Sequence, residues 1–201
     1  MILVKDLSIE RSNKKIFENI NLSLGSGKII LLRGKNGSGK TTLLKAMINI
    51  IEPSSGSIFW KGKPIKKNLY DFYKHITYIA DKTSSLSKLS VEDNINIWRK
   101  IFLSKISKPQ IENILRTMKL DIYLNQKVSS LSFGEIKKLE LLRLIIENKK
   151  IWILDEPLSN LDEQTIDIIE QTFNDHRSKE GSVIFSSHQN SDIGISEEIR
   201  L

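Results

Sequence analysis

The sequence predicts an α/β fold in which a phosphate-binding core carries an N-terminal antiparallel β subdomain and an inserted α-helical subdomain. Three observations predict it. An apolar run at 29–32 leads into the glycine-rich stretch GKNGSGKTT at 34–42, and a helical pattern follows. Strand patterns without helices fill most of the chain before residue 29, and the pattern from about 90 to 148 is helical. A second continuous apolar run, at 151–154, then returns the chain to alternating strand and helix.

The N-terminal part is predicted to form a small sheet beside the main sheet. Residues 2–9 and 16–24 alternate as strands, and the polar cluster 11–15 between them indicates a hairpin-type turn. Gly25-Ser26-Gly27 interrupts the strand pattern before the buried strand at 29–32. A helix is predicted at 40–51, and a short aromatic strand at 57–60 ends near Gly62.

The rest of the chain completes the core around a helical insertion. A strand is predicted at 76–80, and helices are predicted after Ser90, at 109–119 and from about Gly134. The core resumes with the strand 151–154, the helix 162–177, the strand 182–185 and an edge strand near 197–201. We therefore predict one domain over 1–201, with about 1–81 and 149–201 as the core and about 82–148 as the helical subdomain.

Composition narrows the class of protein. The 201 residues include no cysteine, which excludes disulfides and thiolate metal sites. No apolar run approaches the roughly 18 residues that cross a bilayer, and no signal pattern opens the chain, so we expect any membrane contact to come through a partner. The formal net charge is +7, but the lysines are scattered in pairs, as is typical of a solvated surface.

The glycine-rich stretch has the spacing G-x-x-x-x-G-K-[ST] between a strand and a helix. Glycines let the backbone turn several N–H groups inward, and the following helix adds its N-terminal donors and dipole to the same anion site. Lys40 is expected to reach the β- and γ-phosphates, and Thr41 to bind Mg²⁺. A plain turn would not need the Lys-Thr pair. We predict a nucleoside triphosphate site formed by Gly34, Lys35, Asn36, Gly37, Ser38, Gly39, Lys40, Thr41 and Thr42.

Two acids follow the second apolar run. An acid at the end of a buried strand beside a phosphate loop can hold Mg²⁺, and an adjacent acid can polarise the attacking water. We assign Asp155 to the metal and Glu156 to the general base. Without the phosphate loop, the same pair would be two solvated acids at a strand end.

The stretch LSFGE at 131–135 opens a predicted helix and has two interpretations. Ser132 and Glu135 have the spacing of a capping box, which satisfies backbone N–H groups at a helix start. The same serine and the backbone of Gly134 could instead contact the γ-phosphate of a second nucleotide. Taken alone, the pattern favours the cap.

Together these motifs resemble the nucleotide-binding subunit of an ABC (ATP-binding cassette) ATPase, over nearly the whole chain. GKNGSGKTT matches the Walker A loop, IWILDEP at 151–157 the Walker B strand, and LSFGE the signature. Residues 159–162 match the D-loop, and His188 after an apolar strand matches the switch histidine. The resemblance implies a P-loop NTPase core and an ATPase that uses ATP and Mg²⁺.

The resemblance also implies how the site works. Ser132 and Gly134 of one chain would close over ATP held by a second cassette, so a homodimer is expected. Lys40, Glu156 and His188 would be the catalytic residues. Integral membrane transporter subunits are the implied partners, contacted through the helical subdomain, and no direct contact with nucleic acid is expected.

The chain departs from the family pattern at the site. Asp81 stands where the family usually has Gln; an acid can still bind Mg²⁺, but it adds negative charge near the γ-phosphate. Phe133 replaces a small residue and Glu135 replaces Gln, whereas Ser132 and Gly134 are retained. The adenine-stacking aromatic falls near Arg11, whose guanidinium can stack on a base, and Phe17 is the alternative.

Segments around the motifs resemble one particular branch of the family. The segments 58–65 and 151–157, the residues 187–189 and the short length are similar to the ATP-binding subunit of the bacterial cytochrome c maturation (haem) exporter. That branch works at the cytoplasmic face of the inner membrane, as a peripheral subunit. The alternatives are the ATPase of another ABC exporter, a soluble cassette acting on nucleic acid, and a regulator that hydrolyses ATP poorly.

Overall fold

The computed structural model describes residues 1–12, 14–188 and 193–201. Two residues used in the sequence analysis lie outside the described residues: Asn13, in the predicted turn, and Gln189, in the segment 187–189 that resembles the cytochrome c maturation branch. Among the described residues, the central layer is a parallel sheet in the order β6-β7-β8-β3-β9. Its strands are β3 (Ile29–Arg33), β6 (Ile76–Ile79), β7 (Ile151–Leu154), β8 (Ser182–Ser186) and β9 (Glu197–Arg200). The predicted core strands are confirmed, and β9 lies at the edge beside β3.

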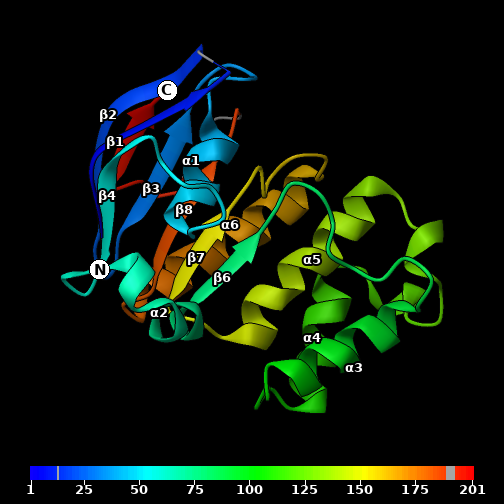
Figure 1. Ribbon diagram of the computed structural model, residues 1–201. Helices are drawn as coiled ribbons and strands as arrows, with labels where there is room; N and C mark the ends of the chain where they lie inside the picture. Colours follow the sequence, from blue (N-terminus) through cyan, green and yellow to red (C-terminus); the bar gives the residue numbers. More distant parts are fainter. Residues whose placement is uncertain (13, 189–192) are drawn as a thin grey trace.

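An antiparallel sheet in the order β2-β1-β4-β5 forms the N-terminal subdomain. Its long strands match the prediction, and β4 begins two residues earlier than predicted; β5 pairs back onto β4 after a turn at Lys61 and Gly62. The strands are β1 (Ile2–Arg11), β2 (Lys14–Leu24), β4 (Ser55–Trp60) and β5 (Lys63–Pro64). Figure 1 shows β1, β2 and β4 on one side of the parallel sheet, with α3, α4 and α5 on the other.

The parallel sheet separates two hydrophobic cores, which explains why its strands are apolar without alternation. Side chains of successive strand residues point to opposite faces. Leu31 and Phe185 belong to the core that includes the helical subdomain, whereas Ile30 and Ile184 belong to the core beneath the antiparallel sheet. Trp152 and Ile153 divide in the same way on β7. Both faces of the sheet are therefore covered, as the runs at 29–32 and 151–154 predicted.

The three helices α3, α4 and α5 each begin after a capping serine. Ser90, Ser107 and Ser132 each form a capping box with the residue three positions later. The helices are α1 (Lys40–Met47), α2 (Leu69–His75), α3 (Val91–Ile101), α4 (Lys108–Thr117), α5 (Phe133–Glu147) and α6 (Glu163–Ser178), with single 3₁₀ turns at Ile65–Lys67, Asp121–Tyr123 and Val128–Ser130.

Two helices differ from expectation. The helix predicted at 40–51 ends at Met47, because the chain turns over 48–51 with a positive φ at Asn49. The short α2 was not predicted; Phe72 is its buried residue, so it has too few apolar positions to produce a helical pattern. The overall class is the predicted one, a P-loop NTPase fold with an antiparallel β subdomain and inserted helices. The boundaries of the subdomains remain a prediction.

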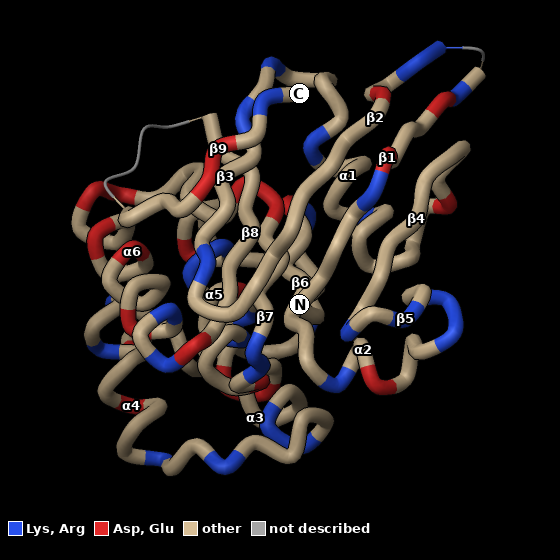
Figure 2. Tube along the Cα trace, turned by 90° about the vertical axis from the view of Figure 1, so that its left-hand side faces the viewer, with Lys and Arg blue, Asp and Glu red and all other residues tan. Residues whose placement is uncertain are grey.

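Charged residues are distributed over the whole trace. Figure 2 shows Lys and Arg interspersed with Asp and Glu on the β subdomain, the core and the helical segment alike. No helix among the described residues is both long enough and apolar enough to span a membrane.

Candidate active site

The phosphate loop joins the end of β3 to the start of α1 and depends on its glycines. Gly37 and Gly39 have φ values of 82° and 106°, in a region that glycine adopts more readily than any other residue. A Cβ on Gly39 would lie 2.7 Å from Cγ2 of Ile16, so the loop also needs the missing side chain. Gly39 caps α1 without a side-chain hydrogen bond, which leaves N–H groups of the first turn for an anion.

A cavity of about 400 Å³ lies over this loop. It brings together residues of the phosphate loop and the residues two positions after the ends of β6, β7 and β8. Three of its residues, at the start of β2, were not predicted. The lining comprises Lys14, Lys15, Ile16, Asn36, Gly37, Gly39, Lys40, Thr41, Thr42, Asp81, Glu156 and His188.

Other predicted residues lie beside this cavity or away from it. Gly34, Lys35 and Ser38 belong to the loop but do not line the cavity. A Cβ on Gly34 would clash with Ser38 Oγ and with the carbonyl oxygen of Leu201, so this glycine allows the loop to approach the chain end. Arg11 is exposed outside the lining. Phe17 is buried against Gly39 and does not line the cavity, whereas Ile16 does.

The three predicted catalytic side chains contact one another. Lys40 is 6% exposed, and its Nζ lies 2.9 Å from the Gly34 carbonyl oxygen and 2.9 Å from Nε2 of His188. Oε1 of Glu156 lies 3.1 Å from the same Nε2 and 3.7 Å from Lys40 Nζ. When Nε2 carries no proton, it accepts the hydrogen bond from Lys40, whereas its approach to Glu156 is a contact at ion-pair distance and no hydrogen bond. The imidazole of His188 therefore lies between the ammonium group of Lys40 and the carboxylate of Glu156.

The acids after β7 are held by backbone and by one serine. Asp155 is 1% exposed, and its N–H donates to the Ile79 carbonyl oxygen over 2.8 Å. Ser186, at the end of β8, donates from Oγ to Asp155 Oδ1 over 2.8 Å and accepts from the N–H of Glu156 over 2.8 Å. The sequence analysis missed Ser186. The sequence offered one signal: Ser186 directly follows the predicted strand 182–185, as Asp155 directly follows the predicted strand 151–154.

The donor set fits Mg²⁺ carried by a nucleotide. Mg²⁺ is typically bound through one or two carboxylates, with phosphate and water supplying the other ligands. Thr41 and Asp81 line the cavity, and the buried Asp155 directly precedes Glu156 of the lining. The described residues contain no cluster of three or more His, Cys, Asp or Glu that could hold a metal unaided. The side chains thus suit a metal that needs phosphate oxygens to complete its shell.

The start of α5 forms the predicted cap. The Ser132 N–H donates to Glu135 Oε2 over 2.7 Å, and the Glu135 N–H donates to Ser132 Oγ over 3.3 Å. A hydrogen bond from Tyr123 holds the pKa of Glu135 below its ordinary value. A Cβ on Gly134 would lie 2.7 Å from the Asn160 carbonyl oxygen, so this glycine allows α5 to approach the loop after Glu156. Ser132 and Gly134 do not line the nucleotide cavity of their own chain.

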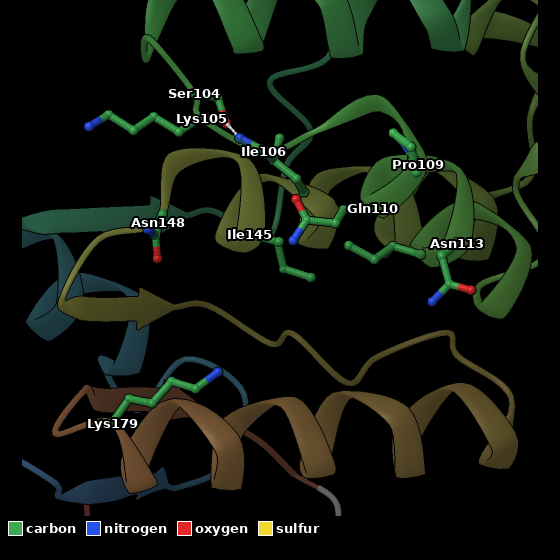
Figure 3. Close-up of a pocket in the computed structure, with 10 residues that line it drawn as sticks. Ser104, Lys105, Ile106, Pro109, Gln110, Asn113, Ile145, Asn148 and Lys179 are labelled. Atoms are coloured by element: carbon green, nitrogen blue, oxygen red, sulfur yellow. Dashed lines mark hydrogen bonds between the residues drawn. The ribbon is translucent and has the colours of Figure 1, made fainter.

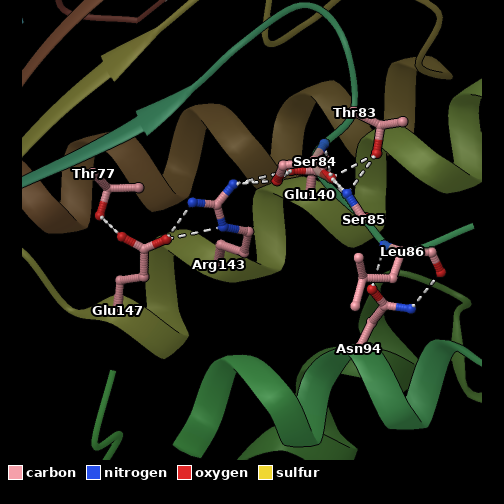
Figure 4. A network of polar contacts seen from close by, with 9 residues as sticks. All are labelled: Thr77, Thr83, Ser84, Ser85, Leu86, Asn94, Glu140, Arg143 and Glu147. Carbon is pink, nitrogen blue, oxygen red and sulfur yellow. Dashed lines mark hydrogen bonds and ion pairs between the residues drawn. The ribbon is translucent and has the colours of Figure 1, made fainter. Parts of the chain in front are cut away.

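A buried polar network ties the loop after Asp81 to the helices (Figure 4). Glu140 on α5 accepts from the side chains of Thr83, Ser84 and Ser85 over 2.6–2.9 Å, and from the N–H groups of the two serines. Burial opposes ionisation of Glu140, but these hydrogen bonds and Arg143 outweigh it and lower its pKa.

The same network continues in both directions from this loop (Figure 4). On α3, Asn94 exchanges hydrogen bonds with the backbone of Leu86 over 2.7 and 3.1 Å. On the other side, Arg143 joins Glu140 to Glu147, which accepts from Thr77 of β6. The loop is thereby fixed between the parallel sheet and two helices of the insertion.

A second cavity, of about 660 Å³, lies between α4, α5 and the end of α6 (Figure 3). Lys105 and Lys179 border it from opposite sides, and Ile145 and Asn148 come from the end of α5. None of the predicted site residues lines it. The predicted site residues that line either of these two cavities therefore gather at the smaller one, over the phosphate loop.

Comparison with known proteins decides the family. The family described as "ABC transporter" matches residues 17–159, from within β2 to the loop after Glu156. The chain belongs to the ABC transporter family. It is an ATP-binding subunit of this family, and its reaction is the hydrolysis of ATP.

Individual relatives cover most of the chain. "Cytochrome c biogenesis ATP-binding export protein CcmA" of Vibrio vulnificus (strain YJ016) is 31% identical over 189 residues, covering 94% of this chain and 92% of that protein. "ABC transporter I family member 1" of Arabidopsis thaliana is 34% identical over 202 residues, covering 100% of this chain and 87% of that protein.

A solved ATP-binding cassette shares the fold. It is described as dimeric, in a post-hydrolysis state bound to ADP and Pi, and superposes with a TM-score of 0.75 at 17% identity. The match covers 94% of this chain and 88% of that chain.

Proposed function

We propose that this ABC ATPase is the ATP-hydrolysing subunit of a haem exporter for cytochrome c biogenesis. It would act as a peripheral protein at the cytoplasmic face of the bacterial inner membrane, bound to integral membrane subunits. The observation that carries the proposal is the similarity to the cytochrome c biogenesis export protein of Vibrio vulnificus, at 31% identity over 94% of this chain. The match spans the helical segment as well as the nucleotide core, and it is the helical segment that is expected to contact the membrane subunits.

The working form is proposed to be a homodimer. Ser132 and Gly134 are placed at the N-terminus of α5, where backbone N–H groups favour an anion, yet they do not line their own chain's cavity. A second copy would bring this helix end over the γ-phosphate, as the family resemblance implies. The dimeric state of the similar solved cassette supports this arrangement.

Each site side chain then has a separate role in hydrolysis. Lys40 binds the β- and γ-phosphates through its ammonium group, and Thr41, Asp155 and Asp81 are the proposed holders of Mg²⁺, which would offset phosphate charge. Glu156 takes the proton of the attacking water. His188, next to both Lys40 and Glu156, donates to the charge that develops on the γ-phosphate.

The general base is tested by Glu156→Gln, which keeps the shape and removes the proton acceptor. We expect ATPase turnover to fall at least about a hundredfold, as is typical for removing general-base catalysis, and the variant to elute as a dimer with ATP and Mg²⁺ in size-exclusion chromatography. Glu112→Gln, on the exposed side of α4, is the matched control. Full turnover of Glu156→Gln would exclude the assigned base.

The exporter assignment needs a separate experiment. Affinity-tagged protein isolated from native membranes in mild detergent should carry two integral membrane subunits, identified by mass spectrometry. A partner pair that handles haem, with haem-stimulated ATPase activity in the purified complex, is the expected result. Partners of another exporter class, or no membrane partner, would contradict the assignment without affecting the ATPase reaction.

A further inference from the structure

A buried lysine on α5 faces the unusual acid of the nucleotide site. Lys137 is 7% exposed, and its Nζ is a buried atom that makes no hydrogen bond to the described residues. Nζ lies 3.5 Å from Oδ1 of Asp81, its ion-pair partner. An ammonium group withdrawn from water needs compensation by an opposite charge. The Asp81 carboxylate supplies that charge at this position.

Asp81 belongs to two cavities at once. It lines the nucleotide cavity together with Lys40, Thr41 and Glu156. It also lines a neighbouring cavity of about 580 Å³, where Lys137 and Phe133 come from α5. The Asp81 side chain is 61% exposed, so it can face phosphate on one side while Lys137 approaches it from the other.

The contact is held by the network shown in Figure 4. Glu140 lies one turn after Lys137 on α5 and fixes the backbone of Ser84 and Ser85, three and four residues after Asp81. The separation between α5 and the Asp81 loop is therefore set by buried hydrogen bonds and not by the exposed carboxylate. Lys137 stays near residue 81 whether that residue is an acid or an amide.

We propose that Lys137 is a positioning residue for ATP hydrolysis, which neutralises Asp81 and keeps its carboxylate compatible with a bound nucleotide. Without Lys137, the negative charge of Asp81 would oppose the phosphates at close range. With it, the pair presents no net charge where the family usually has a neutral amide. The inference concerns ATP binding and turnover, and it does not depend on the exporter or its substrate.

The test is a double-mutant cycle on ATPase kinetics. Lys137→Met keeps an unbranched side chain of nearly the same length and removes the charge. We expect the KM for ATP with Mg²⁺ to rise about fivefold, the scale of one exposed ion pair, with a smaller change in kcat. Lys137→Arg should keep the KM. In a chain that already carries Asp81→Gln, Lys137→Met should leave the KM unchanged, because no charge remains to be neutralised.

Two further measurements distinguish an electrostatic effect of Lys137→Met from a loss of folding stability. The thermal midpoint of Lys137→Met should match or exceed that of the unmodified chain, because methionine suits a buried position better than an ammonium group. Raising the salt concentration should reduce the KM difference, because the exposed carboxylate is screened.

The neighbouring lysine gives a matched control. Lys138 pairs with Asp162 over 2.9 Å and faces another loop. Any effect of Lys138→Met should persist in the Asp81→Gln background. Three outcomes would each overturn the proposal. The first is that Lys137→Met leaves the KM unchanged, and the second is that its rise in KM persists in the Asp81→Gln background. The third is that Asp81→Gln also removes an effect of Lys138→Met on the KM.

Discussion

The hydroxyl of Ser186 donates a hydrogen bond of 2.8 Å to Oδ1 of the buried Asp155. The same oxygen accepts the N–H of Glu156 over 2.8 Å, at a residue whose φ of 47° lies in the left-handed region. One side chain of β8 therefore fixes the carboxylate assigned to the metal and the backbone that aims the assigned base. Because β8 is paired with both β7 and β3, this serine ties the acids to the strand that carries the phosphate loop.

Ser186→Ala should lower ATPase turnover more than it lowers nucleotide binding. The substitution leaves Asp155 Oδ1 and the Glu156 N–H without their partner, so the base loses its fixed direction. We expect kcat to fall about tenfold or more and the free energy of unfolding to fall by about 1–3 kcal/mol, the scale for an unsatisfied buried group. Steady-state ATPase assays, equilibrium ATP binding and urea denaturation measure the three effects.

Ser182→Ala is its control on the same strand. Ser182 is also buried and donates to the Gly25 carbonyl oxygen, but at the opposite end of β8. A similar loss of stability with ATPase turnover retained is expected. Equal loss of turnover in both variants would show that Ser186 acts only through the stability of the strand.

Gly39→Ala should strongly weaken nucleotide binding. An alanine there needs a φ of 106° and places its Cβ 2.7 Å from Ile16 and 3.0 Å from Phe17, so the loop must move away from β2. We expect ATP affinity to fall at least about a hundredfold, because the N–H groups of the loop no longer converge on the phosphates. Gly25→Ala, where a Cβ meets nothing within 4 Å, should bind ATP normally in the same calorimetric titration.

Much of the fold and site follows from local pattern, because strand, loop and helix starts depend on neighbouring residues. The apolar runs 29–32 and 151–154 and the capping serines are visible in sequence for this reason. Contacts between distant segments are not. Lys137 meets Asp81, and Ser186 meets Asp155, only because parallel strands and α5 place them together. The short α2 and the approach of Lys14 to the cavity depend in the same way on packing and strand register.

Glu140→Gln should loosen the loop that follows Asp81. The carboxylate accepts hydrogen bonds from Thr83, Ser84 and Ser85 and pairs with Arg143, and an amide can accept at only one of its two terminal atoms. We expect the free energy of unfolding in urea to fall by about 3 kcal/mol, as for other broken buried ion pairs. Amide hydrogen exchange over 82–86 should become faster. Glu92→Gln, at an exposed position of α3, should change the free energy of unfolding by no more than about 0.5 kcal/mol and should leave amide exchange over 82–86 unchanged.

His176 should make the protein less stable as the pH falls below neutrality. Its ring stacks on Trp152 at 3.6 Å and 5°, and its Nε2 lies 3.2 Å from the Lys150 carbonyl oxygen. Burial lowers the pKa of His176 to about 4, from an ordinary value of 6.5. Between these two values the unfolded chain binds more protons than the folded chain, so the free energy of unfolding decreases as pH falls from about 6.5 towards 4.

His176→Phe isolates this contribution, because phenylalanine keeps the stacked ring and cannot be protonated. At pH 7 the variant should be less stable by about 1 kcal/mol, the scale of the lost contact with Lys150. At pH 5 the difference should shrink or reverse, because only the unmodified chain then loses stability through His176. Urea denaturation at the two pH values measures both differences, and other titrating groups are the same in both chains. A stability difference that stays constant from pH 7 to pH 5 would show that His176 is not held neutral by its burial against Trp152.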